Sequence, residues 1–257
     1  MEGSDSSVWF SPSNSQQKAR SLHILTIHFR KMKIYAHRGF SGKFPEGSKT
    51  AYLEAVKAGA DGFECDVRIT KDGIPVCFHD RTTKRITGRS GLVSRLTLSQ
   101  IRERFEIITL EELLKLSLDK KCDLIIETKH PVVSGRGVEK KVLRILDKYS
   151  SRITKSGVRV VLISFSYFAV KFLANKHMDV GWVVKLKWKL RFAPTKIIAF
   201  DIEKIGKIES NRHLKGKELF LWTVNTKSEF RDAAKLNPSA IITDRPDWMR
   251  ASLSSRP

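Results

Sequence analysis

The chain has 257 residues, of which 48 are Lys or Arg and 27 are Asp or Glu, giving a formal net charge of +21. With 41% hydrophobic residues it is too apolar for a disordered protein, and its length suits one domain, or two at most. The positive charge favours anionic partners such as nucleic acid, anionic lipid or a phosphorylated substrate, but a solvated basic surface explains it equally well.

No run of apolar residues approaches the ~20 needed to cross a bilayer. The cysteines Cys65, Cys77 and Cys122 are far apart and include no CxxC pair, so they predict neither a disulfide framework nor a zinc site. We expect each to be a small buried core residue in a reducing compartment.

Residues 1–31 differ from the rest, because their first part is rich in Ser, Gln and Asn and has no periodic pattern. A signal peptide begins with basic residues followed by about 7–15 apolar ones, whereas the first basic residue here is Lys18. We therefore expect no export and a cytoplasmic protein. We interpret 1–31 as a non-native extension before a natural start at Met32, or as a disordered tail or docking arm, and 32–257 as the folded domain.

From Met32 onward, strand-like and helix-like segments alternate, which implies a mostly parallel sheet. The predicted strands are 34–37, 62–69, 74–79, 123–127, 158–163, 180–184, 196–201, 218–223 and 240–243. The helical patterns cover 49–58, 98–104, 110–116, 138–149, 167–176 and 227–236. About 225 residues with eight such units fit an α/β fold, the (β/α)8 TIM barrel.

The pattern contains one strand more than a barrel of eight positions needs. Thr70-Lys71-Asp72-Gly73 is good turn chemistry between the second and third strands, so these two are predicted to form a β-hairpin early in the barrel. The alternative architecture is an open doubly wound sheet. It is weaker, because no Gly-rich phosphate loop follows the first strand.

Polar residues gather at the ends of the predicted strands, where barrel enzymes carry their active sites. Glu64 and Asp66 occupy positions i and i+2 of one strand and therefore point to the same side. Glu127 ends another strand and is followed by Lys129. Crowded carboxylates resist joint ionisation unless a cation joins them, and Mg²⁺ and Ca²⁺ prefer such oxygen ligands. The sequence therefore predicts a divalent-cation site.

Two histidines also end strands, in His37-Arg38-Gly39 and His79-Asp80. A single histidine there is more often structural, but two beside three carboxylates favour proton transfer near neutral pH. Cleavage of a phosphodiester needs a base, an acid and positive charge on the phosphoryl oxygens. Arg38 and Lys129 supply that charge, since Arg binds phosphate in a bidentate manner and Lys acts as a point charge.

Together these residues resemble the glycerophosphodiester phosphodiesterases. The resemblance runs from residue 33 to about 250, and its strength lies in the order of the motifs, since each is weak alone. The stretches that carry it are Ala36-His37-Arg38-Gly39, Pro45-Glu46-Gly47-Ser48, Glu64-Cys65-Asp66-Val67, Thr70-Lys71-Asp72-Gly73, Pro75-Val76-Cys77-Phe78-His79-Asp80, Glu127-Thr128-Lys129, Ser164-Phe165, Trp222-Thr223-Val224-Asn225 and Thr243-Asp244-Arg245-Pro246.

The resemblance implies a (β/α)8 barrel that uses one divalent cation, Ca²⁺ or Mg²⁺, to hydrolyse glycerophosphodiesters to an alcohol and glycerol 3-phosphate. In such enzymes the glycerol hydroxyl can attack the phosphorus first, giving a cyclic phosphate that water opens. The roles it implies are metal ligation by Glu64, Asp66 and Glu127, acid/base catalysis by His37 and His79, phosphate binding by Arg38 and Lys129, and pocket positions at Glu46, Phe165 and Trp222. Glu46 is expected on the metal side or as a hydrogen-bonding residue.

The chain departs from the family pattern in three places. Gly47 stands where the family has Asn, and the segment after Asp80 is short. Residues 185–191 alternate basic residues with Leu and Trp, which we interpret as an amphipathic strand or loop with a solvated basic face. In the alternative interpretation this segment is a rim that contacts membrane phosphates or accepts a lipid-derived substrate, with Trp182, Trp188 and Phe192 as interfacial residues.

Two other functions stay open from the sequence. One is a lysophospholipase D-like activity at a membrane surface, with peripheral contact to anionic lipid. The other is a catalytically silent anion-binding module. Nucleic acid is not expected as a partner, because the charge is scattered and no helix-turn-helix or zinc-finger pattern occurs.

Overall fold

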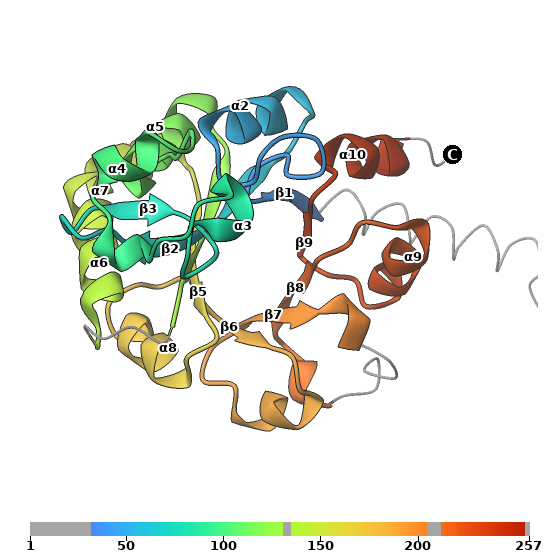
Figure 1. The fold of residues 1–257 in the computed structure, drawn as a ribbon. Helices are drawn as coiled ribbons and strands as arrows, with labels where there is room; N and C mark the ends of the chain where they lie inside the picture. The colour runs from blue at the N-terminus through green and yellow to red at the C-terminus, as the bar shows by residue number, and fades with distance from the viewer. Residues whose placement is uncertain (1–31, 131–134, 205–211, 255–257) are drawn as a thin grey trace, which may run out of the picture.

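In the computed structural model, which describes residues 32–130, 135–204 and 212–254, parallel strands form a closed barrel. β1 pairs on one side with β2 and on the other with β9, so the first and last strands lie side by side (Figure 1). The parallel strands of the barrel are β1 (Lys33–His37), β2 (Gly62–Ile69), β4 (Asp123–Thr128), β5 (Val160–Ser164), β6 (Val180–Val184), β7 (Ile197–Asp201), β8 (Glu218–Trp222) and β9 (Ala240–Thr243).

The ninth described strand, β3 (Pro75–Cys77), is not part of the barrel wall. It pairs with β2 in antiparallel fashion, with Val67 opposite Cys77. The predicted barrel and its early β-hairpin are therefore confirmed, and the open doubly wound sheet is wrong. β3 is shorter than the predicted strand 74–79, although the backbone N–H of Phe78 still donates to the carbonyl of Asp66 on β2.

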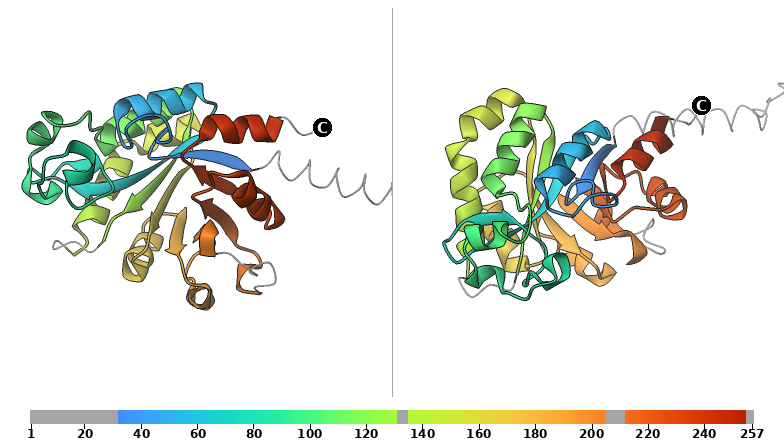
Figure 2. Two further views of the ribbon diagram at one scale, coloured as in Figure 1. Left: turned by 45° about the vertical axis from the view of Figure 1, so that its right-hand side comes forward. Right: turned by 45° about the horizontal axis from the view of Figure 1, so that its top comes forward.

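Helices cover the outside of the barrel, as the views in Figure 2 show from two further sides. The α-helices are α2 (Lys49–Lys57), α3 (Lys84–Thr87), α4 (Leu98–Arg102), α5 (Leu110–Lys120), α6 (Gly137–Lys148), α7 (Ser150–Ser156), α8 (Tyr167–Ala174), α9 (Lys227–Lys235) and α10 (Pro246–Ser254). Short 3₁₀ turns are η1 (Val93–Arg95), η2 (Lys187–Phe192), η3 (Ile202–Lys204) and η4 (Arg212–Leu214). The sequence pattern did not predict α3, α7 or α10.

Side-chain hydrogen bonds fix where several of these helices begin. Thr109 accepts from the backbone N–H of Glu112, whose carboxylate accepts in return from the backbone N–H of Thr109. Thr226 and Glu229 form the same reciprocal pair at α9. Such capping boxes satisfy backbone donors that a helix leaves open at its first turn.

The alternation of side chains along each strand separates two apolar layers. Ile34 and Ala36 face outward and pack in the large core between strands and helices. Tyr35 between them faces the barrel interior, with Ile125, Ile163 and other lumen residues. Because successive side chains alternate, the next residue on the interior face of each strand lies nearer the carboxyl end, at the mouth.

The structure tests the prediction for the cysteines but not the interpretation of residues 1–31. Cys65, Cys77 and Cys122 are free and buried, as predicted. The interpretation of 1–31 lies outside the described residues. In the described part of the chain, no helix has both the length and the apolar character that crossing a bilayer requires.

Gly62, at the start of β2, has no room for a larger side chain. A Cβ atom on Gly62 would lie 2.6 Å from Tyr35 Cε1 and 2.6 Å from the carbonyl oxygen of Asp123, on the two neighbouring strands. We expect Gly62→Ala to lower the free energy of unfolding by about 1–3 kcal/mol, measured by denaturant unfolding. Gly62→Val should cost more, although Val is the better strand former. A valine variant more stable than the alanine variant would contradict this account.

Candidate active site

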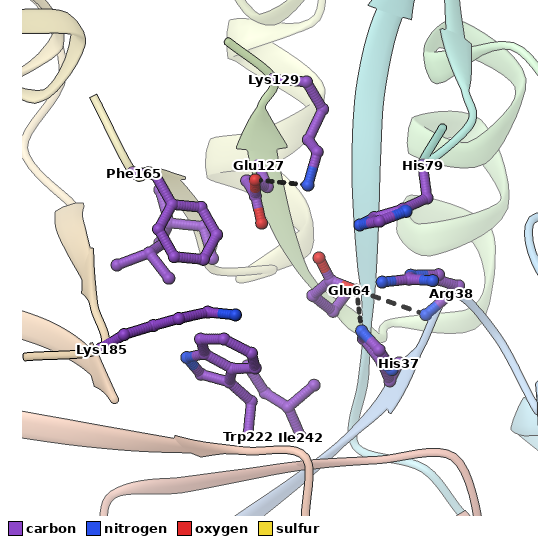
Figure 3. Close-up of a pocket in the computed structure, with 12 residues that line it drawn as sticks. His37, Arg38, Glu64, His79, Glu127, Lys129, Phe165, Lys185, Trp222 and Ile242 are labelled. Atoms are coloured by element: carbon purple, nitrogen blue, oxygen red, sulfur yellow. Dashed lines mark hydrogen bonds and ion pairs between the residues drawn. The ribbon is translucent and has the colours of Figure 1, made fainter. Parts of the chain in front are cut away.

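The mouth of the barrel opens into a cavity of about 470 Å³, measured with its opening to solvent (Figure 3). Residues from most of the strands contribute to its wall. They are His37, Arg38, Glu64, His79, Glu127, Lys129, Ile163, Phe165, Val183, Lys185, Trp222 and Ile242.

The period of two along the strands explains why these residues meet. Ile125 faces the lumen, so Glu127 does too, one step nearer the mouth. Val183 places Lys185 in the same way. The site is therefore the top layer of the barrel interior, where the apolar side chains of the lumen give way to charged ones.

Three carboxylates form the floor of this layer. Asp66 on β2 is the direct neighbour of Glu127 on β4, and Glu64 lies one step below Asp66 on the same face. One oxygen from each of the three lies within 4.8 Å of the others, and all three residues are buried. Asp66 Oδ2 has no hydrogen-bond partner among the described residues. This donor set fits a divalent cation, which would also complete the coordination of that buried oxygen.

The charges on the three carboxylates conflict. Burial, followed by the charge of Asp66, raises the pKa of Glu64 well above its ordinary value and that of Glu127 to about 7. Burial alone would also raise the pKa of Asp66, but Lys129 and Arg38 lie so close that they lower it to about 2. Two of the three carboxyl groups therefore resist ionisation in the absence of further positive charge.

Arg38 and Lys129 supply part of that charge. Lys129 Nζ lies 2.8 Å from Glu127 Oε1 and 3.1 Å from Asp66 Oδ1. Arg38 Nε lies 2.8 Å from Asp66 Oδ2 without hydrogen-bond geometry, and its Nη1 donates to Glu46 at 3.1 Å. Although burial opposes it, these carboxylates raise the pKa of both Lys129 and Arg38, so both remain cations beside the cavity.

His37 is oriented by a carboxylate from the last strand region. Its Nδ1 lies 2.7 Å from Asp244 Oδ1, and its Nε2 lies 3.9 Å from Glu64 Oε2 at the cavity. Asn225 Nδ2 and Ser41 Oγ donate to Asp244 at 2.6 and 2.9 Å. Burial opposes ionisation of Asp244, but the hydrogen bond with His37 lowers its pKa to about 2. A carboxylate on one ring nitrogen fixes the tautomer and leaves the other nitrogen to the cavity.

His79 has a matching arrangement. Its Nδ1 lies 2.7 Å from Asp80 Oδ1, and Arg85 Nε donates to Asp80 Oδ2 at 2.6 Å. The same Arg85 donates two hydrogen bonds to Glu46, at 2.9 and 2.7 Å. Burial lowers the pKa of His79 from its ordinary value, although the charge of Asp66 opposes this. Arg85 thus connects the partner of His79 with the partner of Arg38.

The structure brings the sequence-predicted residues together with one difference in position. Glu46 is not among the residues that line the cavity and contacts Arg38 and Arg85 instead, so of its two expected roles hydrogen bonding is the one observed. Phe165 and Trp222 line the cavity as an edge-to-face pair with ring centroids 5.8 Å apart. Trp182 is only 5% exposed, so its assignment as an interfacial residue is wrong.

The sequence interpretation gave no site role to Asp80, Asp244, Arg85 or Lys185. The two aspartates belong to motifs at predicted strand ends, so their position in the sequence could have indicated a place at the mouth of the barrel. Lys185 follows from extending the strand alternation past Val183. Arg85 had no signal, because its contacts depend on how the short helix α3 folds back. The segment 185–191 is not a strand, since its main part forms the 3₁₀ turn η2.

Comparison with known proteins agrees with this geometry. The sequence model of the glycerophosphoryl diester phosphodiesterase family matches residues 37–248. The chain belongs to this family. It is 31% identical to a glycerophosphodiester phosphodiesterase of Caldanaerobacter subterraneus subsp. tengcongensis, over 85% of this chain and 96% of that protein. It is 30% identical to one of Bacillus altitudinis, over 84% of this chain and 95% of that one.

Solved structures confirm the fold of a glycerophosphodiester phosphodiesterase. The Thermotoga maritima enzyme superposes with a TM-score of 0.71 at 24% identity, covering 86% of this chain and 98% of that one. An Oleispira antarctica phosphodiesterase in complex with the product sn-glycerol-3-phosphate gives 0.72 at 20% identity, covering 89% and 99%.

Family membership makes the chain a phosphoric diester hydrolase of glycerophosphodiesters and removes the alternative of a catalytically silent module. The family depends on a divalent metal, and the buried trio Glu64, Asp66 and Glu127 could hold one.

The bridging position of Arg85 predicts an effect on turnover, although half of its side chain is exposed. We expect Arg85→Ala to lower kcat about 10-fold, because Asp80 and Glu46 lose the charged hydrogen bonds that position His79 and Arg38. The kcat of Arg85→Lys should lie between those of the wild type and Arg85→Ala, since Lys cannot contact both carboxylates in the same forked geometry. Steady-state kinetics over a pH range would measure kcat, KM and the part of the pH–rate profile that depends on the protonation of His79.

The matched control for Arg85 is Lys84→Ala, which removes one exposed positive charge from the same short helix. If both alanine variants keep wild-type kcat and the same pH profile, Arg85 does not position the site.

Proposed function

We propose that the enzyme hydrolyses glycerophosphodiesters to an alcohol and glycerol 3-phosphate with one divalent cation, Ca²⁺ or Mg²⁺, and two histidines. The cation ligands in this proposal are Glu64, Asp66 and Glu127, and the proton carriers are His37 and His79. The observation that carries the proposal is that two imidazoles, each with its own carboxylate on Nδ1, border the cavity that Glu64 and Glu127 of the acidic trio also line.

The phosphate position in this proposal follows from the cations. Arg38 and Lys129 both line the cavity and both contact the acidic trio, so a phosphoryl group beside the trio would meet positive charge from two side chains (Figure 3). A bound divalent cation would add charge to the same phosphoryl oxygens and stabilise the negative charge that develops in the transition state.

Proton transfer is assigned to the two imidazoles because a phosphodiester needs a base for the attacking hydroxyl and an acid for the leaving oxygen. Asp244 and Asp80 hold Nδ1 of each ring, so Nε2 is the atom that takes or gives the proton. Either ring can be the base, and the same pair serves attack by the glycerol hydroxyl or by water.

The opposite wall is assigned to the carbon skeleton of the substrate. Phe165 and Trp222 form an apolar corner there, and Lys185 lies against both rings, 5.7 and 5.2 Å from their centroids. Glu46 acts outside the cavity in this proposal, holding the Arg38 guanidinium in place.

Removal of the metal and of single side chains tests these roles. EDTA should abolish release of choline from glycerophosphocholine, and added Mg²⁺ or Ca²⁺ should restore it. His37→Ala and His79→Ala should each lower kcat about 10²–10⁴-fold while metal binding, measured by calorimetry, stays intact. Glu64→Gln should weaken metal binding and activity together, because a neutral amide cannot offset the cation charge.

Glu103→Gln serves as the control for Glu64→Gln, since it makes the same change on an exposed helix end. Wild-type kcat in either histidine variant would refute the acid/base assignment.

A second candidate within the same chemistry is hydrolysis of lysophospholipids at a membrane, by a cytoplasmic enzyme in peripheral contact with anionic lipid. Exposed aromatic residues beside the cavity favour it, since Trp188 is 58% and Phe192 50% exposed. If it is correct, kcat/KM on micellar lysophosphatidylcholine should exceed that on glycerophosphocholine at least 10-fold, measured as choline release. Equal values, or a preference for the soluble diester, would exclude it.

A further inference from the structure

Exposed apolar side chains are concentrated on one side of the cavity. Among the described residues, the large hydrophobic side chains that stand open to solvent are Phe165, Phe168, Met178, Leu186, Trp188 and Phe192. All except Met178 follow the carboxyl ends of β5 and β6, which are neighbouring strands of the barrel. Exposed large apolar groups gathered in this way mark an interaction site rather than chance.

The short turn η2 holds its aromatic residues outward. Leu190 is 2% exposed and packs in the core, whereas Trp188 and Phe192 stand on either side of it at the surface. Their rings meet edge to face, with centroids 6.4 Å apart. Lys189 lies over the first ring and Arg191 over the second. The turn therefore presents aromatic rings and cations together at the surface. Its backbone connects β6 with β7 (Figure 1).

The charge of this region has one sign. Residues 185–196 and 164–176 contain no Asp or Glu. Lys185, Lys187, Lys189 and Arg191 have no carboxylate partner within ion-pair distance in the described parts of the chain. Elsewhere in the fold, basic side chains often pair with acids, as Arg159 does with Asp179 and Glu218.

We propose that Phe168, Leu186, Trp188 and Phe192, together with Lys187, Lys189 and Arg191, form a docking surface for an anionic lipid bilayer. We call these residues the docking surface. Aromatic rings and aliphatic side chains enter the interfacial region of a bilayer, while the cations beside them meet lipid phosphates. Nucleic acid would satisfy the cations but would leave the aliphatic Leu186 and the outward rings without an apolar partner.

The docking surface is continuous with the active site. Lys185 lines the cavity and begins the segment that becomes η2, and Phe165 lines the cavity two residues before α8. A bilayer against the docking surface would therefore lie beside the cavity mouth. This part rests on the proposed function, and it assigns as substrate class a phosphodiester that carries an acyl chain and enters from the lipid.

Vesicle binding tests the docking surface without using catalysis. The full chain should co-sediment with phosphatidylcholine vesicles that contain phosphatidylserine and much less with phosphatidylcholine alone, and salt should weaken the binding. Joint replacement of Trp188 and Phe192 by Ala should weaken binding at least 10-fold. Joint Lys187→Glu and Lys189→Glu should weaken it similarly, and only at low salt.

Matched controls lie at the other end of the barrel. Met178→Ala removes a fully exposed apolar side chain, and Lys176→Glu reverses an exposed charge before β6. Both should bind vesicles as wild type does. The Trp188 and Phe192 variant should also keep wild-type kcat/KM on soluble glycerophosphocholine, which shows that it is folded and separates docking from catalysis.

The outcomes separate the two proposals. Vesicle binding that is unchanged in the Trp188 and Phe192 variant, or lost equally in the Met178 control, overturns the docking surface. Binding to duplex DNA but not to vesicles overturns it as well and assigns the cations to nucleic acid. Intact vesicle binding without hydrolysis of any glycerophosphodiester would instead refute the proposed function and leave the docking surface standing.

Discussion

The repulsion among three buried carboxylates is the constraint around which the mouth of the barrel is built. Glu64, Asp66 and Glu127 are buried and are held within 4.8 Å of one another by the pairing of β2 with β4, so their charges repel in a poorly solvated place. Arg38 and Lys129 offset two of the three charges and in doing so are themselves fixed beside the cavity. With three carboxylates and two cationic side chains, the cluster has one uncompensated negative charge when all are ionised. This charge favours binding of a metal cation, which in turn attracts a phosphate group.

Closure of the barrel is what completes this arrangement. His37 lies level with Glu64 because β1 pairs with β2, and it meets Asp244 because β1 also pairs with β9. The two partners of the His37–Asp244 contact are separated by 207 positions in the sequence. A contact of this kind exists only after the first and last strands have joined, so the site and the overall fold form together.

Sequence reasoning succeeded where a local rule decides the outcome. The strands 62–69, 180–184 and 240–243 have the observed bounds, and the shared face of Glu64 and Asp66 follows from alternation alone. It failed where the answer depends on distant pairing. Asp244 could not be joined to His37 without knowing that the barrel closes, and Arg85 depends on the fold of a four-residue helix. Trp182 was misassigned although alternation was informative, because Val183 and Lys185 face the lumen and their neighbour Trp182 must then face the helices.

The two imidazoles are not electrostatically equivalent, although each has a carboxylate on Nδ1. Asp244, the partner of His37, accepts hydrogen bonds from the neutral groups of Asn225 and Ser41. Asp80 is already paired with the Arg85 guanidinium, and Arg38 lowers the pKa of His79 further. Burial and the Arg38 guanidinium therefore oppose a positive charge on His79, whose carboxylate partner already holds a second cation, Arg85.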